Sequence, residues 1–346
     1  MFYAAMDVEL DIERPGALEA YLRDTGRISA AETVRVEVLA GGVSNRTVLV
    51  ERKSGEAWVV KQALAKLRVA VDWFSDPRRI EREALGLKYL AEMAPPEAIT
   101  PLVFEDPAHH LLAMQAVPRP HENWKTMLLA GRVEMRHVEQ FGRLLGTIHR
   151  AGTERRVEMA QIFGDRSFFE SLRVEPYYLY TADRVPEAKT FLKELVFETR
   201  LRQQTVVHGD YSPKNILVVG RENRLVLLDH EVIHFGDPAF DLGFSLTHFL
   251  AKGHHLRAYR AQFAEAARVY WKAYRAVLGA VRWRGELEEF AVRHTLGCLL
   301  ARVDGRSPLE YLTAGARAWQ RAAVLSMMGD VPSSVDELVE IFLDRE

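Results

Sequence analysis

The sequence predicts an α+β protein with an antiparallel sheet and one main helix in its N-terminal part and a mostly helical C-terminal part. Two observations carry this prediction. Residues 34–60 alternate apolar and polar side chains, as half-buried strands do. Further along the chain, apolar residues recur at helical spacing instead, for example at Val138 and Phe141. We therefore expect two lobes, residues 1–117 and residues 118–346.

The composition limits the class of protein. The chain has 346 residues, of which 48% are hydrophobic and 27% charged, and its net charge is −2. This balance is ordinary for a globular protein, and the net charge gives no global electrostatic footprint for nucleic acid or an anionic membrane. The single cysteine, Cys298, excludes an intrachain disulfide. No apolar run reaches the roughly 18 residues of a membrane span, and no signal-peptide pattern begins the chain. We expect a cytoplasmic protein, and the sequence makes no prediction about its oligomeric state.

Three strands are expected between residues 34 and 60, and small and polar residues separate the first from the second. This loop contains Gly41, Gly42, Ser44 and Asn45. It is either a simple hairpin turn or a loop whose glycines let backbone N–H groups approach phosphate groups.

A lysine and a glutamate in the N-terminal part form a candidate ion pair. Lys61 ends the third strand, and residues 77–93 predict a helix with an apolar stripe. Glu83 lies at the edge of that stripe, where an acid is costly unless it is paired. We expect Lys61 to be its partner, the arrangement with which kinases hold nucleotide phosphates. The alternatives are a solvated strand end for Lys61 and a solvated border position for Glu83.

The pattern after this helix predicts two further strands and then a series of helices. Their expected positions are strands around 101–104 and 111–116, helices over 122–130 and 134–151, and helices over 166–200 that break at Pro176 and Pro186. The second strand ends at Pro118, and it is the last strand expected before the helical part.

The most informative stretch runs from His208 to Asp241. Asp210 follows a glycine in a loop, where its carboxylate can orient a hydroxyl group and accept its proton. Asn215 comes five residues later, and Asp229 ends an apolar hairpin. Carboxylate and amide oxygens suit Mg²⁺, so we expect Asn215 and Asp229 to be metal ligands. This order matches the general template of phosphoryl transfer.

Three other residues of the stretch could support the site. Glu231 would project to the same side of an extended chain as Asp229, as a further metal group or a substrate contact. His208 is expected to brace the loop rather than to act as a base. Asp241 is either the N-cap of the following helix or an acceptor for backbone N–H groups of the 208–210 loop.

Two motifs in this stretch point to a family. HGDYSPKNIL (208–217) and LDHEVIHFGDPAFDL (228–242) closely resemble the aminoglycoside phosphotransferase/choline kinase family, and LAGGVSN (39–45) is similar to its N-terminal loop. The resemblance implies a protein-kinase-like two-lobed fold, ATP and Mg²⁺ as cofactors, and a small-molecule hydroxyl substrate. It assigns Asp210 as catalytic base, Asn215 and Asp229 as metal ligands, and the Lys61–Glu83 pair to the phosphates.

The same resemblance gives a meaning to the last N-terminal strand. In a two-lobed kinase the chain crosses between lobes here, and its backbone can bond the edge of adenine. Met114 would then line the adenine site, and Gln115 to Val117 would form the connector. The alternative is an ordinary edge strand.

The C-terminal helices are expected to determine which acceptor is used. The candidate substrate-facing groups are His254, His255, Arg302 and Asp304, the last two in a loop between helices. Residues 243–330 contain 13 lysines and arginines against 7 aspartates and glutamates. An acceptor site for a polycationic aminoglycoside should be acidic, so this class of substrate is disfavoured.

Two alternative functions stay open. A relative with the same fold could bind nucleotide without catalysis. The histidines and aspartates of the central stretch could also form a metal-dependent hydrolase site, but that interpretation gives Lys61 and Glu83 no function.

Overall fold

The computed structural model describes residues 10–39, 42–68, 72–220 and 223–344. The chain divides into two compact units. Unit 1 combines Met1–Lys88 with Thr100–Ala116, and unit 2 combines Tyr89–Ile99 with Val117–Glu346. None of the helices in the described ranges combines the length and the apolar character that a membrane span requires.

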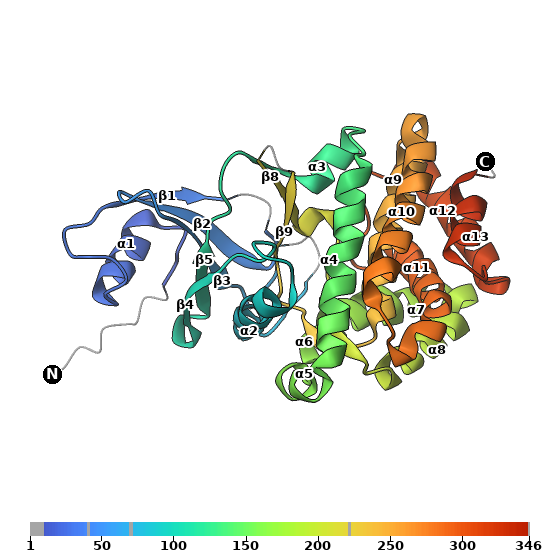
Figure 1. Ribbon diagram of the computed structural model, residues 1–346, viewed down its shortest axis with the longest axis horizontal. Coiled ribbons are helices and arrows are strands. Elements are labelled where there is room, and N and C mark those ends of the chain that lie inside the picture. Colours follow the sequence, from blue (N-terminus) through green and yellow to red (C-terminus); the bar gives the residue numbers. More distant parts are fainter. Residues whose placement is uncertain (1–9, 40–41, 69–71, 221–222, 345–346) are drawn as a thin grey trace. The chain divides into compact units, whose positions relative to one another are not determined.

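Unit 1 is built on a five-stranded antiparallel sheet with the strand order β1-β2-β3-β5-β4 (Figure 1). The strands are β1 (Val34–Val38), β2 (Asn45–Arg52), β3 (Ala57–Ala63), β4 (Leu102–Asp106) and β5 (Leu111–Gln115). Val48 on β2 lies opposite Val60 on β3, and both are buried in a core with Leu18 and Leu22 of helix α1 (Pro15–Asp24). Because alternate residues of a strand face the same side, one face of the sheet packs against α1.

The main helix of the N-terminal part is α2 (Arg79–Met93). Ile80, Ala84 and Leu87 form its buried stripe at helical spacing. The predicted α+β architecture, with an antiparallel N-terminal sheet and one main helix, is confirmed.

Unit 2 is mostly helical. Its longer helices are α4 (Met135–Glu154), α8 (Lys189–Leu201), α9 (Pro238–His255), α10 (Arg260–Leu278), α11 (Leu287–Asp304) and α12 (Ala314–Gly329). The shorter ones are α3 (Trp124–Leu129), α5 (Arg156–Phe163), α6 (Ser167–Phe169), α7 (Tyr180–Arg184) and α13 (Val335–Val339). Helices α4 and α10 run side by side (Figure 1), and a Cβ atom at Gly142 would lie only 2.5 Å from the carbonyl oxygen of Tyr270. Glycine is therefore required where these two backbones meet.

Two small antiparallel sheets in unit 2 carry the loops of the central stretch. One contains β6 (His121–Asn123), β8 (Ile216–Val219) and β9 (Arg224–Leu227), and the other pairs β7 (Thr205–Val207) with β10 (His234–Gly236). The helix expected over 122–130 was wrong at its start. Residues 121–123 pair with β8, and Asn123 then caps α3 by accepting a hydrogen bond from the Lys125 N–H at 3.1 Å.

Two further expectations about helix boundaries were wrong. Pro176 does not end a helix but lies inside a π-helical segment, Glu170–Leu179. In a π-helical turn the hydrogen bond spans five residues, which displaces the carbonyl that a proline ring meets in an α-helix. Arg302 and Asp304 are not in a loop, because α11 continues to Asp304 and ends at Gly305.

Candidate functional site

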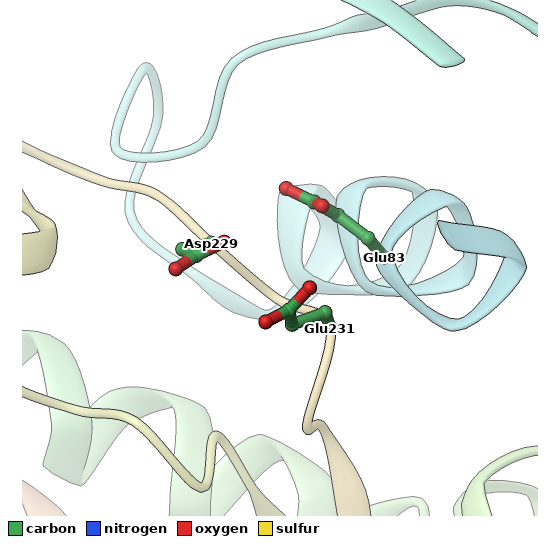
Figure 2. Close-up of side chains that lie close together, drawn as sticks. All are labelled: Glu83, Asp229 and Glu231. Carbon is green, nitrogen blue, oxygen red and sulfur yellow. The ribbon is translucent and has the colours of Figure 1, made fainter. Parts of the chain in front are cut away.

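Lys61 and Glu83 form a close ion pair within unit 1. Lys61 lies on β3 and Glu83 on α2, and the Lys61 Nζ atom is 2.6 Å from Glu83 Oε1. Glu83, drawn on its helix in Figure 2, has a side chain that is 0% exposed, so the alternative of a solvated border position is wrong. A buried carboxylate needs such a partner, and the pair fixes the lysine ammonium at the end of its strand.

The loop before β2 is held by its own polar groups. A Cβ atom at Gly42 would lie 3.2 Å from the carbonyl oxygen of Asn45. The Asn45 Nδ2 group donates to Ser44 Oγ at 3.2 Å, and the Ser44 carbonyl accepts from the Leu64 N–H at 3.0 Å and from the guanidinium of Arg79. Gly41 lies outside the described residues. The described half of the loop is thus anchored to the rest of unit 1.

The segment predicted to contact adenine lies at the end of β5. Met114 is buried opposite Val59, and Gln115 is exposed with its N–H donating to the Pro101 carbonyl at 2.9 Å. Val117 is buried in unit 2 with Val219 and Val226. The contacts of this segment are those of an ordinary strand end, and its role towards a nucleotide stays a prediction.

Asp210 lies in a tight loop directly after β7. Gly209 has a φ of 78°, and a Cβ atom there would come within 2.9 Å of the Val232 carbonyl oxygen. Only glycine fits this turn, which presents Asp210 at the end of a short buried strand.

Asp241 fixes the backbone of this loop through hydrogen bonds. Its carboxylate is fully buried and accepts hydrogen bonds from the His208 N–H at 2.7 Å and the Gly209 N–H at 2.8 Å. Burial opposes its ionisation, but the hydrogen bond and charge of His149 hold the pKa of Asp241 below its ordinary value. The N-cap of α9 is Asp237, which accepts from the Ala239 N–H at 3.0 Å, so the N-cap interpretation of Asp241 is wrong.

The histidines of the central stretch make further contacts in and around this loop. His208 Nδ1 accepts from the Asp210 N–H at 3.2 Å, and its Nε2 lies 3.1 Å from His230 Nδ1. Burial lowers the pKa of His208, which favours the neutral imidazole. His234 stacks on Phe169 with 4.0 Å between ring centroids. These imidazoles bond to the loop and to one another, which gives no support to the metal-dependent hydrolase.

Asn215 is oriented by Asp210. The Asn215 Nδ2 group donates to the Asp210 carbonyl at 2.9 Å and to Asp210 Oδ2 at 2.7 Å. Both amide hydrogens are therefore used, and Oδ1 is the atom that remains for a cation.

Asp229 and Glu231 supply two carboxylates after β9. Asp229 has a φ of 68°, a conformation rare outside glycine that is often found at functional sites. Figure 2 shows both side chains on the same short segment, and their carboxylate oxygens lie within 4.8 Å of each other. Together with the amide oxygen of Asn215, these groups are the hard oxygen donors that suit Mg²⁺.

Arg173 is the site residue that the sequence did not predict. It lies in the π-helical segment, and its Nη2 atom is 3.0 Å from Asp210 Oδ1, while its Nε group donates to the Gly209 carbonyl at 2.7 Å. Burial opposes its charge, but the surrounding carboxylates, Asp210 first, raise the pKa of Arg173. A single guanidinium thus holds both the backbone and the carboxylate of the loop. No short motif surrounds Arg173, and its partner is 37 residues away in sequence.

Two of the four predicted substrate-facing residues are used in helix packing. His254 stacks on Trp319 with ring centroids 4.3 Å apart. Asp304 forms an ion pair with Arg321, at 2.7 Å between Oδ2 and Nε.

The other two lie beside aromatic rings. The His255 and Tyr311 ring centroids are 4.9 Å apart. The guanidinium of Arg302 lies 5.0 Å from the ring centroid of Tyr177 and 5.2 Å from that of Phe244.

Comparisons with known proteins show which family and fold the chain is similar to. A family model described as "Phosphotransferase enzyme family" matches residues 35–284. No curated protein sequence matches the chain significantly.

Several solved structures share the fold. An ethanolamine kinase from Plasmodium vivax is 11% identical, with a TM-score of 0.56, over 88% of this chain and 86% of its own. An amicoumacin kinase solved with AMP-PNP and Ca²⁺ is 12% identical, with a TM-score of 0.55, over 87% and 89%. A choline kinase from Streptococcus pneumoniae is 13% identical, with a TM-score of 0.52, over 91% and 98%. At these identities the likeness shows a shared kinase fold.

Proposed function

This chain belongs to the phosphotransferase enzyme family, and we propose that it transfers the γ-phosphoryl group of ATP to a hydroxyl group of a small polar metabolite. The single observation that carries the proposal is the arrangement at Asp210. The Asp210 carboxylate is contacted by Asn215 and Arg173. The buried Asp241 fixes the loop that carries it through the Gly209 N–H.

Asp210 is the proposed catalytic base. In the proposed reaction the acceptor oxygen attacks the γ-phosphorus, the bond to the β–γ bridging oxygen breaks, and the hydroxyl proton passes to the Asp210 carboxylate. Arg173 and Asn215 position that carboxylate through the contacts at 3.0 and 2.7 Å. Such positioning contributes to rate because the reacting atoms must be aligned before transfer.

Asn215 and Asp229 are the proposed ligands of Mg²⁺, with Glu231 as a further candidate. Bound there, Mg²⁺ would neutralise charge on the nucleotide phosphates. The support is the set of oxygen donors. Asp229 and Glu231 have carboxylate oxygens within 4.8 Å of each other, and Asn215 adds an amide oxygen whose orientation its Nδ2 hydrogen bonds fix.

Nucleotide binding is assigned to residues of the N-terminal part. Lys61, held by Glu83, would contact the α- and β-phosphates, since a buried carboxylate fixes its ammonium. The remaining proposed nucleotide contacts are Gly41, Gly42, Ser44, Asn45, Met114, Gln115 and Val117. Residues 1–117 would then form the nucleotide-binding lobe and residues 118–346 the catalytic lobe.

A screen of acceptors tests the proposed function. Purified protein with ATP and Mg²⁺ is incubated with sugars, hydroxy acids, amino alcohols, nucleosides and aminoglycosides, and ADP and phosphorylated product are measured. We expect acceptor-dependent ADP release and one phosphorylated product. Nucleotide binding with no product from any hydroxyl compound would instead favour the non-catalytic relative.

A further inference from the structure

A group of basic side chains, two of them buried and one half-buried, lies among the helices of unit 2. Lys252 on α9 is 0% exposed, and His248, one turn earlier on the same helix, is 6% exposed. Arg302 on α11 acts electrostatically on both. We call these three residues the basic cluster. Tyr311 lies beside it, with its ring centroid 5.6 Å from Lys252 Nζ.

The basic cluster lacks a balancing acid. Lys252 Nζ donates to the His248 carbonyl at 3.4 Å, and no carboxylate of a described residue lies within ion-pair distance of it. Among the described residues whose charges act on Lys252, Glu310 is the single acid, and it is already paired with Lys125. Burying like charges without a counter-ion is costly, so an uncompensated group of this kind calls for an anion.

Several buried polar atoms of the basic cluster and of Tyr311 are also unsatisfied, although Arg302 Nη1 donates to Ser307 at 2.9 Å. Both ring nitrogens of His248, the Nε of Arg302 and the hydroxyl of Tyr311 have no hydrogen-bond partner among the described residues. Ammonium, guanidinium and phenol groups are hydrogen-bond donors, and buried donors are rarely left without an acceptor. Carboxylate or phosphate oxygens would satisfy several of them at once.

The pKa of Lys252 reflects the cost of burying its charge near other cations. Burial, together with the charges of Lys125 and Arg302, lowers the pKa of Lys252 to about 7. A bound anion would oppose both effects and favour the ammonium form.

The basic cluster lies next to the residues that hold Asp210. Arg302 is 5.0 Å from the Tyr177 ring centroid and 5.2 Å from that of Phe244. Arg173 lies at the same two rings, at 5.8 and 5.7 Å, and contacts Asp210 at 3.0 Å. Arg302 of the basic cluster and Arg173 at the proposed catalytic base therefore lie beside the same pair of aromatic rings.

We propose that the basic cluster binds an anionic group of the acceptor, a carboxylate or a phosphate, while the acceptor's hydroxyl group lies at Asp210. This inference rests on the proposed kinase function and specifies its substrate class. The acceptor is then a small hydroxy acid or a sugar phosphate, rather than an amino alcohol or an aminoglycoside.

The first test compares acceptors that differ in charge. Hydroxy acids, sugar phosphates, their neutral analogues and amino alcohols are assayed with the wild type and with Lys252→Met and Arg302→Met. We expect the anionic acceptors to have the highest kcat/KM. In both variants their KM should rise at least about tenfold, since each variant removes a charge partner of the anion. The relative rates of hydroxy acids and sugar phosphates distinguish the two anions.

A matched control comes from the same helix. Arg293 on α11 lies beside an aromatic ring as Arg302 does, 5.6 Å from the Phe290 ring centroid, but it is paired with an acid, Glu198, at 2.7 Å. Arg293→Met should leave the KM of the anionic acceptor unchanged. Preference for a neutral or cationic acceptor, or an unchanged KM in both cluster variants, would overturn the inference while leaving the kinase function intact.

A binding measurement separates the two proposals. With saturating Mg·ADP present, inorganic phosphate should raise the melting temperature of the wild type and of Arg293→Met but not of the two cluster variants. An equal shift in all four proteins would contradict an anion site at the basic cluster. If phosphate binding needs the basic cluster but no acceptor is ever phosphorylated, the kinase proposal fails and its acceptor class with it, while the anion site is supported.

Discussion

Asp241 and Lys252 are both buried charged residues of unit 2, but they differ in how their polar atoms are satisfied. Asp241 is fully buried and accepts hydrogen bonds from two backbone N–H groups and from His149. Lys252 is equally buried, but within the described part of the chain it donates its hydrogen bond to a backbone carbonyl of its own helix. The buried charge of Asp241 is satisfied by groups of the protein itself, whereas that of Lys252 would be balanced by the anion that we propose to bind there. This difference separates a charge that serves the fold from one that we propose serves a ligand.

The largest effect on stability is expected for substitution of Asp241. Asp241→Ala should lower the free energy of unfolding by about 3–5 kcal/mol, because two backbone N–H groups and His149 lose a buried partner. Urea unfolding of wild type and variant measures the change. Asp241→Asn, which keeps one acceptor oxygen, should lose less than the alanine variant. Equal stability of all three proteins would contradict the bracing role of Asp241.

Loss of a proposed metal ligand should change nucleotide affinity rather than stability. Asp229→Ala should weaken Mg²⁺-dependent ATP binding by more than about 100-fold, since even outer partners of metal ligands cost 10–100-fold. Calorimetric titration with ATP, with and without Mg²⁺, measures the effect. Glu231→Gln in parallel reports whether the second carboxylate shares the ion. An Asp229→Ala variant with unchanged affinity would remove Asp229 from the ligand set.

Arg173 tests whether positioning of the loop matters for turnover. Arg173→Met should lower kcat by about 10–100-fold with little change in nucleotide affinity, because the loop loses its guanidinium anchor. Arg173→Lys keeps the charge but cannot keep the forked contacts, so it should recover only part of the rate. Steady-state kinetics with the preferred acceptor provide the readout. Full activity of Arg173→Met would show that Asp241 alone positions the loop.

The smallest effect is expected for substitution of Lys252, and it should raise the free energy of unfolding rather than lower it. Without acceptor at pH 7, Lys252→Met should raise the free energy of unfolding by about 1 kcal/mol, because an uncompensated buried charge is removed. Chemical unfolding in phosphate-free buffer measures it. A variant less stable than the wild type would indicate that Lys252 serves the fold.

The pH dependence gives a second measure of the same lysine. Burial lowers its pKa in the folded state from the ordinary 10.5 to about 7. Between these values the unfolded chain binds more protons, so the stability of the wild type should rise with pH above about 7. Lys252→Met should lack this rise. Identical pH profiles of the two proteins would contradict the shifted pKa.

Short motifs allowed much of the candidate site to be predicted from the sequence. Asp210, Asn215 and Asp229 follow one another in a single stretch, and local strands and turns place them. Lys61 and Glu83 could be paired because an acid on an apolar helix stripe needs a partner. The predicted antiparallel sheet and main helix follow from regular alternation and helical spacing.

Non-local contacts explain what could not be predicted. Arg173 reaches Asp210 across 37 residues of sequence, and no pattern links the two. Strand β6 is three residues long and depends on pairing with β8 far along the chain. Lys252 lies on α9, which is buried on every side through most of its length and therefore shows no polar face to mark the lysine as unusual.

The most direct test of the central claim is the turnover of Asp210→Ala. If Asp210 accepts the hydroxyl proton, acceptor phosphorylation should fall by about 10²–10⁴-fold. The affinity for Mg·ATP should stay within about twofold of the wild type, since nucleotide contacts are assigned to other residues. Near-normal phosphorylation by this variant would contradict the account.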